Sequence, residues 1–538
     1  MADLGKHVGR YAVFAGCILG LVVAIPLGFA WPPAWLFAVV FAALVLLGLR
    51  DLVQRKHSIQ RNYPVIGHIR WWVEAVRPEL RQYLIEADEE AAPFSRDQRV
   101  LVYERAKGEV GEHPFGTLLD VYREGYEFLA HSAMPADAAD PASFRITIGG
   151  PQCAKPYRAS VFNISAMSFG SLSANAIRAL NAGAKKGGFS HDTGEGSISP
   201  YHREMGGDIV WEVASGYFGC RTDDGRFDPA KFAEQAQTDQ VRMIEIKLSQ
   251  GAKPGHGGVL PAAKVTREIA DTRGVPMGRD CISPSRHSAF STPLEMMAFV
   301  AQLRQLSGGK PVGFKLCIGH PWEFMAIVKA MLESGVLVDF VVIDGAEGGT
   351  GAAPTEFSDH IGLPMREGLL FVHNTLVGAG LREKIKIGVA GKIVSAFDIA
   401  SVLAIGADWA NAARGFMFAI GCVQSVSCNT NRCPTGVATQ DALRQSALVV
   451  PDKAERVHNF HRLTLKALSD MLAAAGLEHP DDLKPYHLVR RVSPTEIRQF
   501  SELHTFLKPG DLLGDCCEDG LYGDNWKWAS AESFAPNP

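Results

Sequence analysis

The sequence has no strong excess of charge and little cysteine for its length. Its 538 residues carry 54 basic and 58 acidic side chains, a net charge of −4, which gives no reason to expect a nucleic-acid partner. Ten cysteines in so long a chain are too few for a disulfide framework. No G-x-G-x-x-G motif follows a predicted strand, so direct binding of NAD(P)H is not expected. The length allows one large domain with attachments, or two to three ordinary domains.

Charge is missing altogether from two apolar runs near the N-terminus. Residues 11–30 and 31–49 contain no charged side chain, and Pro32 and Pro33 separate them. Each run is close to the roughly 20 residues that cross a bilayer as a helix. A cleaved signal peptide would need a shorter apolar core. Basic residues lie on both outer flanks, namely Lys6, Arg10, Arg50, Arg55, Lys56 and Arg61. This pattern predicts a transmembrane hairpin over residues 1–56 in the inner membrane, with the rest of the chain facing the cytoplasm.

Three cysteines are concentrated in the stretch GCVQSVSCNTNRCPTGVATQ. Cys422, Cys428 and Cys433 have the spacing C-x5-C-x4-C-P, with Gly, Asn and Pro between them, which predicts an irregular loop. Thiolates on a short loop are typical of iron–sulfur sites. Two other readings stay open: three unrelated packed cysteines, or a zinc site, although structural zinc usually has four ligands and closer spacing. The adjacent Cys516 and Cys517 have no role that the sequence indicates.

From about residue 158 onward, short β-branched runs alternate with helical stretches. Helices are expected over 173–187, 291–307, 321–335 and 395–406. Strands alternating with helices predict a parallel sheet, and eight such units predict an α/β fold of the (β/α)8 barrel type, with an open doubly wound sheet as the alternative. The eight strand candidates are residues 160–167, 187–192, 243–249, 279–285, 312–317, 339–345, 384–391 and 407–413.

Polar or glycine-rich residues follow each predicted strand. In a barrel these positions share the carboxyl rim, where active sites form and where the last two loops usually bind phosphate. A single such loop would read as an ordinary turn, but eight in register predict a site for a phosphate-bearing cofactor. The positions include Ser168, Glu195, Gln250, Lys253, Lys315, Gly349, Thr350, Gly351, Gly391, Arg414 and Gly415.

A set of collinear stretches carries a family resemblance. They are AMSFGSLSANAIRALNAGAKKGG, HDTGEG, ASGYFG, IEIKLSQGAKPGHGG, ISPSRH, FKL, DGAEGGTGAAP and CNTNRCPTGVATQ. Together they resemble the FMN-binding synthase domain of glutamate synthases, and the hairpin with RKHSIQRNYPVIGH resembles shorter, membrane-anchored members of that family. The resemblance implies a barrel with FMN over residues 151–440 and a [3Fe-4S] cluster on Cys422, Cys428 and Cys433. Residues 57–150 would then connect the hairpin to the barrel, and 441–538 would form a C-terminal helical extension.

The family's residue roles map onto this sequence. Glu195 matches the carboxylate beside the imino carbon, where it would handle protons. Gln250, Lys253 and Arg273 match the 2-oxoglutarate site, where two cations suit a dicarboxylate; from its position alone, Arg273 could also be an ordinary surface arginine. The residues expected to bind FMN are Ser168, Lys315, Gly349, Thr350, Gly351, Gly391, Arg414 and Gly415.

The sequence also departs from the family pattern. The phosphate motif D-G-G-L-K-T-G is A-G-K-I-V-S-A over residues 390–396, which keeps one glycine in register. In the loop Q-G-A-K-P-G-E-G-G-Q, His256 and Val259 are replacements, so the substrate pocket is expected to differ. The chain begins with Met1-Ala2-Asp3 in place of the cysteine nucleophile of a glutaminase domain. Ammonia is therefore expected free or from a partner glutaminase.

The resemblance implies reductive amination of 2-oxoglutarate to L-glutamate. Electrons would come from a ferredoxin or a reductase subunit and pass through the cluster to FMN. Two alternatives stay open: an N-alkylglutamate synthase-like or other amine-transfer reaction, and a membrane-tethered electron-transfer module without turnover.

Overall fold

The computed structural model describes residues 9–90, 92–109, 111–514 and 520–538. Lys6, Cys516 and Cys517 lie outside the described residues. The chain divides into two compact units, Met1–Pro93 and Phe94–Pro538, which are described here separately.

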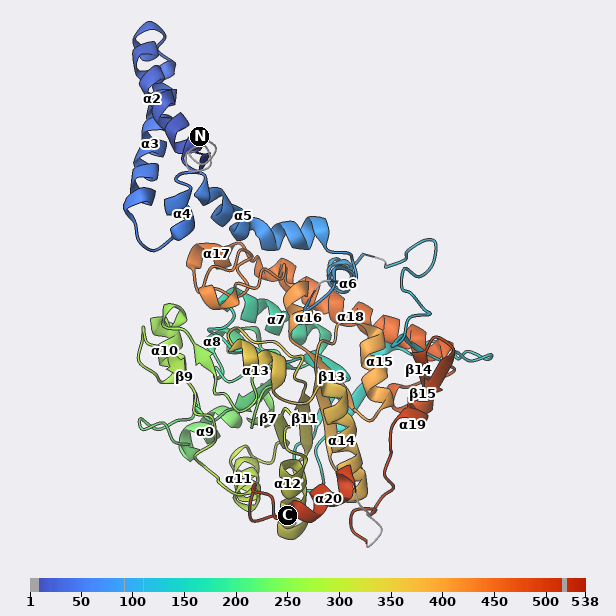
Figure 1. The fold of residues 1–538 in the computed structure, drawn as a ribbon. Coiled ribbons are helices and arrows are strands. Elements are labelled where there is room, and N and C mark those ends of the chain that lie inside the picture. Colours follow the sequence, from blue (N-terminus) through green and yellow to red (C-terminus); the bar gives the residue numbers. More distant parts are fainter. Residues whose placement is uncertain (1–8, 91, 110, 515–519) are drawn as a thin grey trace. The chain divides into compact units, whose positions relative to one another are not determined.

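The first unit contains two long apolar helices, α2 (Ala12–Ala30) and α3 (Ala34–Val53), which pack against each other (Figure 1). Their mean hydropathies are 2.4 and 2.3, and both are long and apolar enough to cross a membrane. Most of their surface is exposed, unlike that of a core helix in a soluble domain. Helices α4 (Ser58–Asn62) and α5 (Gly67–Leu80) follow, and a π-helical turn, η1 (Arg81–Ile85), extends α5.

Eight parallel strands close into a barrel in the second unit. The (β/α)8 prediction is therefore confirmed, and the open-sheet alternative is wrong. In chain order the strands are β4 (Phe162–Ile164), β5 (His191–Asp192), β6 (Ile209–Val213), β7 (Val241–Lys247), β10 (Val312–Leu316), β11 (Phe340–Asp344), β12 (Lys386–Ala390) and β13 (Trp409–Ala412).

One of the eight predicted strands is wrong, and one barrel strand was missed. Residues 279–285 contain only the two-residue strand β9 (Cys281–Ile282), which pairs antiparallel with β8 (Val259–Leu260) outside the barrel. This hairpin belongs to a long excursion between β7 and the next barrel helix. The missed strand is β6, in which every residue is buried. Its pattern is interrupted by Glu212, a charged side chain that is buried inside the barrel.

The helices that follow the strands in sequence lie around the outside of the barrel (Figure 1). The four predicted helices are present as α7 (Ala174–Gly187), α11 (Pro293–Leu306), α12 (Pro321–Ser334) and α15 (Ala396–Ala404). Helix α7 begins where Ser173 Oγ accepts a hydrogen bond from the N–H of Ala176. The remaining outer helices are α9 (Pro229–Ala236), α14 (Met365–Gly378) and α18 (Val450–Ala474), and α18 packs against α7 to complete the ring beyond residue 440.

Smaller strands and helices lie outside the barrel. The hairpin of β2 (Arg145–Ile148) and β3 (Tyr157–Ser160) lies at the amino end, where Gly150 N–H donates to Asp339 just before β11. A separate antiparallel sheet joins β1 (Glu127–Leu129), β14 (Leu488–Ser493) and β15 (Glu496–Gln499). The other α-helices of this unit are α6 (Arg96–Lys107), α8 (Pro200–Met205), α10 (Arg267–Arg273), α13 (Thr355–His360), α16 (Arg414–Ala419), α17 (Ala442–Ser446), α19 (Phe500–Leu503) and α20 (Leu521–Trp528).

Candidate active site at the carboxyl rim of the barrel

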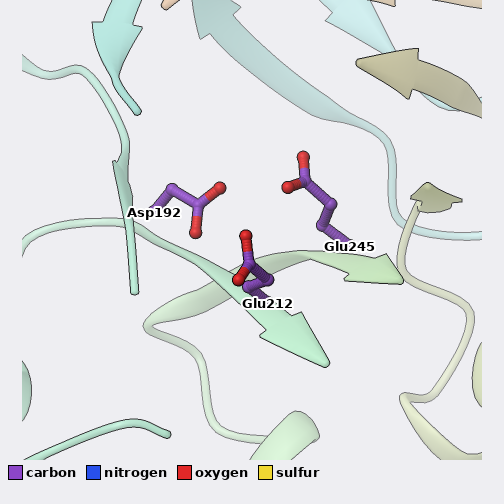
Figure 2. Close-up of side chains that lie close together, drawn as sticks. All are labelled: Asp192, Glu212 and Glu245. Carbon is purple, nitrogen blue, oxygen red and sulfur yellow. The ribbon is translucent and has the colours of Figure 1, made fainter. Parts of the chain in front are cut away.

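Three carboxylates from neighbouring strands converge inside the barrel. Asp192, Glu212 and Glu245 come from β5, β6 and β7, and Figure 2 shows their side chains pointing toward one another. One oxygen of each lies within 4.8 Å of the others. The ammonium group of Lys315, on β10, contacts Glu212 and lies 3.3 Å from Oε1 of Glu245. Lys315 therefore places one cation against two of the three carboxylates, Glu212 and Glu245.

The acid cluster has more carboxylates than its lysine can neutralise. Burial raises the pKa of Glu245 to about 7, since the attraction of Lys315 only partly offsets it and Glu212 adds repulsion. Burial and the neighbouring charge of Glu245 also raise the pKa of Asp192. Burial lowers the pKa of Lys315, but the surrounding carboxylates outweigh this and raise it. The cluster therefore retains a proton near neutral pH beside a charged lysine.

Above the acid cluster, three cations surround one carboxylate. Lys247, at the end of β7, donates from Nζ to Oε2 of Glu195 at 2.6 Å and lies 3.8 Å from Glu212. Burial alone would raise the pKa of Glu195, but Lys247, Arg273 and Lys253 together hold it at about 2. Glu195 is therefore ionised, and this cationic pocket (Glu195, Lys247, Lys253 and Arg273) carries a positive excess.

The residues expected to bind 2-oxoglutarate meet in this cationic pocket. Lys253 Nζ donates to the carbonyl of Ala352 at 2.9 Å, and Gln250 accepts from Lys247 at 2.9 Å. Arg273 is only 2% exposed, so the reading of it as a surface arginine is wrong. Its Nη2 donates to Phe169 O at 3.0 Å, whereas its Nε has no hydrogen-bond partner. Arg273 therefore has one buried donor that no protein group uses.

Two residues expected to bind FMN border the same pocket. Ser168 Oγ lies 3.4 Å from Nη2 of Arg273, and Thr350 Oγ1 lies 3.4 Å from Nε2 of Gln250. These contacts bring the predicted substrate side and the predicted flavin side together. Lys315 lies deeper, where its ammonium group is engaged by Glu212 and Glu245.

The remaining predicted FMN residues lie after β11, β12 and β13. Arg414 Nη2 donates to the carbonyl of Glu347 at 2.8 Å, and a Cβ atom at Gly349 would lie 3.0 Å from the Arg414 guanidinium group. A side chain at position 349 would therefore require the Arg414 guanidinium group to shift. Lys392 follows Gly391 in a left-handed conformation with φ of 53°. Burial lowers the pKa of both Lys392 and Arg414, and the charge of Arg414 lowers the pKa of Lys392 further. Two partly desolvated cations at this rim suit a phosphate group.

The three predicted cluster cysteines are free thiols on one loop. Burial raises the pKa of Cys422 to about 12, and the charges of Cys428 and Cys433 act in the same direction. For Cys433, hydrogen bonds from Thr435 and from loop N–H groups outweigh burial and lower the pKa. Such a cradle of donors fits a thiolate ligand.

The three sulfur atoms of Cys422, Cys428 and Cys433 do not all lie within 4.8 Å of one another. Among the described residues, only the acid cluster brings three candidate ligand atoms within 4.8 Å of one another. Tetrahedral zinc with bonds of about 2.3 Å would need sulfur atoms roughly 4 Å apart. The loop that carries the three cysteines is also held by hydrogen bonds from a buried lysine. Lys264, which is 2% exposed, donates from Nζ to the carbonyls of Ser171, Cys428 and Ala438.

Sequence reasoning missed several polar residues of this region. Asp192, Glu212, Glu245, Lys247, Lys264 and Lys392 were not among the predicted site residues. A signal was available in β7, where Glu245 and Lys247 alternate with apolar residues and therefore share the interior face. Lys264 has no comparable signal, because its partners are backbone carbonyls distant in sequence.

Comparison with known proteins gives consistent matches. Residues 138–478 match a family model described as a conserved region in glutamate synthase. The glutamate synthase large subunit-like protein YerD of Bacillus subtilis is 38% identical over 531 residues, covering 91% of this chain and 99% of the relative. The archaeal-type glutamate synthase (NADPH) of Thermotoga maritima is 33% identical over 321 residues, which is 60% of each chain.

Solved structures show a weaker likeness. A mandelate oxidase variant with an FMN adduct has a TM-score of 0.39 and 14% identity, covering 79% of this chain and 99% of that one. A flavocytochrome b2 variant with pyruvate has a TM-score of 0.41 and 15% identity, with coverages of 83% and 97%. Likeness at this level carries no information on cofactor or substrate.

Proposed function

This chain belongs to the glutamate synthase family of oxidoreductases, and on that premise we propose that it reductively aminates 2-oxoglutarate to L-glutamate. The observation that carries the proposal is the cationic pocket, in which Lys247, Lys253 and Arg273 surround the single carboxylate of Glu195. Such a positive excess, largely removed from solvent, favours an anion with two carboxylates.

Substrate binding would use the donors of this pocket that are least engaged. Burial lowers the pKa of Lys253, so an incoming carboxylate would restore a partner to a desolvated ammonium. Arg273 offers its unpartnered Nε atom. Together the two cations would orient the carboxylates and leave the oxo carbon beside Glu195.

Glu195 would act chiefly through its charge. With a pKa of about 2 it is a weak base in the free protein, so it would stabilise the positive charge of the ammonium ion and of the protonated imine. When a dicarboxylate pairs with Lys253 and Arg273, these cations would depress the pKa of Glu195 less. Its pKa would then rise, and it would become a better proton acceptor during amination.

The proton for imine reduction would come from the acid cluster. Glu245 and Asp192 hold a proton near neutral pH because burial raises the pKa of both. From this cluster, the ion pairs of Lys315, Glu212 and Lys247 lead toward Glu195, with 3.8 Å between Lys247 and Glu212. Such a path would deliver a proton to the imine nitrogen without opening the site to water.

FMN and a [3Fe-4S] cluster would, when bound, supply hydride transfer and one-electron delivery. The glycines and cations after β11, β12 and β13 would hold the FMN phosphate, and Ser168 and Lys315 would face the ring. Cys422, Cys428 and Cys433 would ligate the cluster. The family membership and the three-thiol loop support this assignment.

The two apolar N-terminal helices would anchor the protein in the inner membrane, with the barrel on the cytoplasmic side. Ammonia would arrive free or from a partner glutaminase. Electrons would arrive from a ferredoxin or a reductase subunit.

Anaerobic turnover of the detergent-purified full chain tests the proposal. With 2-oxoglutarate, ammonium and a chemically reduced low-potential donor, glutamate should accumulate by mass spectrometry. Cys428→Ala should abolish its formation. Faster product formation with methylamine than with ammonium would instead support an N-alkylglutamate synthase-like reaction. No product with either amine, despite bound FMN and cluster, would contradict reductive amination.

A further inference from the structure

Helix α5 and the turn η1 carry an apolar face that is exposed to solvent. Of α5, only Gly67 is buried. Ile69, Trp72 and Leu80 are exposed, and so is Tyr83 in the turn. Together with Val76, these residues recur at intervals of three or four, so they share one side of the helix. Arg70, Glu74, Arg77 and Arg81 fall on a different side with the same periodicity.

The start of α5 is fixed to the end of the second apolar helix. Asp51, near the end of α3, is 1% exposed, and its carboxylate accepts a hydrogen bond from the N–H of Val65 at 3.0 Å. The same carboxylate lies 2.9 Å from Nε2 of His68, in the first turn of α5. Gln60 contacts the other ring nitrogen at 3.3 Å. Because these contacts join α3 to α5, the apolar face begins where α3 would leave the bilayer.

The charge of this segment is complementary to an anionic surface. Between residues 50 and 85 there are seven basic and three acidic side chains, of which three basic and two acidic ones lie in α5 and η1 and the rest at the end of α3 and in the stretch that joins it to α5. Basic residues close to a membrane span are attracted to anionic lipids. The segment also contains the adjacent tryptophans Trp71 and Trp72, a residue type enriched at the membrane–water interface.

We propose that α5 and η1 lie along the surface of an anionic bilayer, with Ile69, Trp72, Val76 and Leu80 inserted between the lipid headgroups. The arginines of the segment would face the phosphate groups. This inference rests on the proposed membrane anchor, because α3 sets the depth at which α5 begins. An interfacial helix here would give the chain a second membrane contact beyond the hairpin.

Photocrosslinking identifies what covers this face. A photoreactive benzophenone side chain replaces Trp72 in the full-length protein, in vesicles of equal parts phosphatidylglycerol and phosphatidylcholine. Arg77, on the charged side of the same helix, is the matched control position, and Ile69 is a second apolar position should replacement of Trp72 impair folding. We expect lipid adducts at least fivefold more abundant from positions 72 and 69 than from position 77. Their yield should fall severalfold in vesicles of phosphatidylcholine alone.

Crosslinks from positions 72 and 69 to residues 94–538 or to a second copy of the chain would overturn the inference. Equal lipid adducts from positions 72 and 77 would overturn it too. A probe in place of Leu36, an exposed residue of α3, separates this failure from failure of the anchor. Lipid adducts from position 36 without adducts from position 72 would refute only the interfacial helix. No adducts from position 36 would refute the membrane anchor itself.

Discussion

The Nζ atom of Lys247 lies 2.6 Å from Oε2 of Glu195 and 3.8 Å from Oε1 of Glu212. One side chain thus connects the cationic pocket at the rim with the acid cluster below it. In the proposed reaction the residues at the rim would bind an anionic substrate, and those of the acid cluster would hold a proton.

Glu245 is expected to set the alkaline limb of the pH–activity profile. Burial raises its pKa to about 7, so the cluster loses its proton as the pH rises through that value. Turnover should therefore fall above about pH 7, and Glu245→Gln should lose this limb while turning over roughly 100-fold more slowly. Exposed Glu333→Gln on α12 should keep the parent profile. An unchanged limb in Glu245→Gln would rule out the acid cluster as the proton source.

Glu245 is also expected to make the folded protein less stable as the pH rises. Between the ordinary carboxyl pKa of about 4.3 and the folded value of about 7, the folded protein holds a proton that the unfolded chain has lost. Stability from this group is therefore present at low pH and lost as the pH rises across that window. Thermal unfolding in detergent should show a smaller loss between pH 5 and pH 8 for Glu245→Gln than for the parent. An equal loss would show that Glu245 does not titrate in this range.

Lys264 is expected to hold the cluster loop in place. Its ammonium group donates to three loop carbonyls, and Lys264→Met would leave them buried and unpaired at about 1–3 kcal/mol each. Iron content and the electron paramagnetic resonance signal of the oxidised cluster should fall severalfold. Arg432→Met, an exposed change on the same loop, should leave both unchanged. Full iron content with an unaltered signal in Lys264→Met would show that this lysine is dispensable for the cluster.

Gly349 is expected to control FMN binding through Arg414. A methyl group at this position would lie 3.0 Å from the guanidinium group and displace it from the rim. Gly349→Ala should weaken FMN retention about tenfold, which gel filtration with flavin absorbance measures. Gly319→Ala is the control, because nothing lies within 4 Å of its Cβ position. Equal flavin retention in the two variants would contradict a phosphate site beside Arg414.

Much of the fold could be predicted because strand and helix patterns alternate strictly along the barrel. Strand β6 was missed because Glu212 interrupts an apolar run, which usually indicates a solvent-facing position. In a closed barrel the inner face can be polar as well, so a charge at an alternate position is compatible with full burial. Residues 279–285 were predicted to be a barrel strand because a short apolar run carries no information about the strand with which it pairs.

Most of the predicted site residues lie in loops or helices, whereas four of the missed ones, Asp192, Glu212, Glu245 and Lys247, lie in strands. Glu195, Gln250, Lys253 and Arg273 stand in recognisable motifs, and the structure brings them together. Their neighbour Lys247 and the acid cluster are visible only once the strands are in register, when Glu212 stands beside Glu245 and Lys315 beside Lys247. The sequence shows that these residues are polar. Their pKa shifts depend on the distances between them, which are known only from the closed barrel.

Lys253 offers the most direct test of the cationic pocket as the substrate site. Lys253→Met keeps the length of the side chain and removes its charge, so FMN content should stay at the parent level. The decisive measurement is the rate of anaerobic glutamate formation as a function of 2-oxoglutarate concentration in both proteins. We predict a fall in kcat/KM of roughly 100-fold, as expected for the loss of a buried charge pair worth about 3 kcal/mol. An unchanged kcat/KM with full FMN content would contradict it.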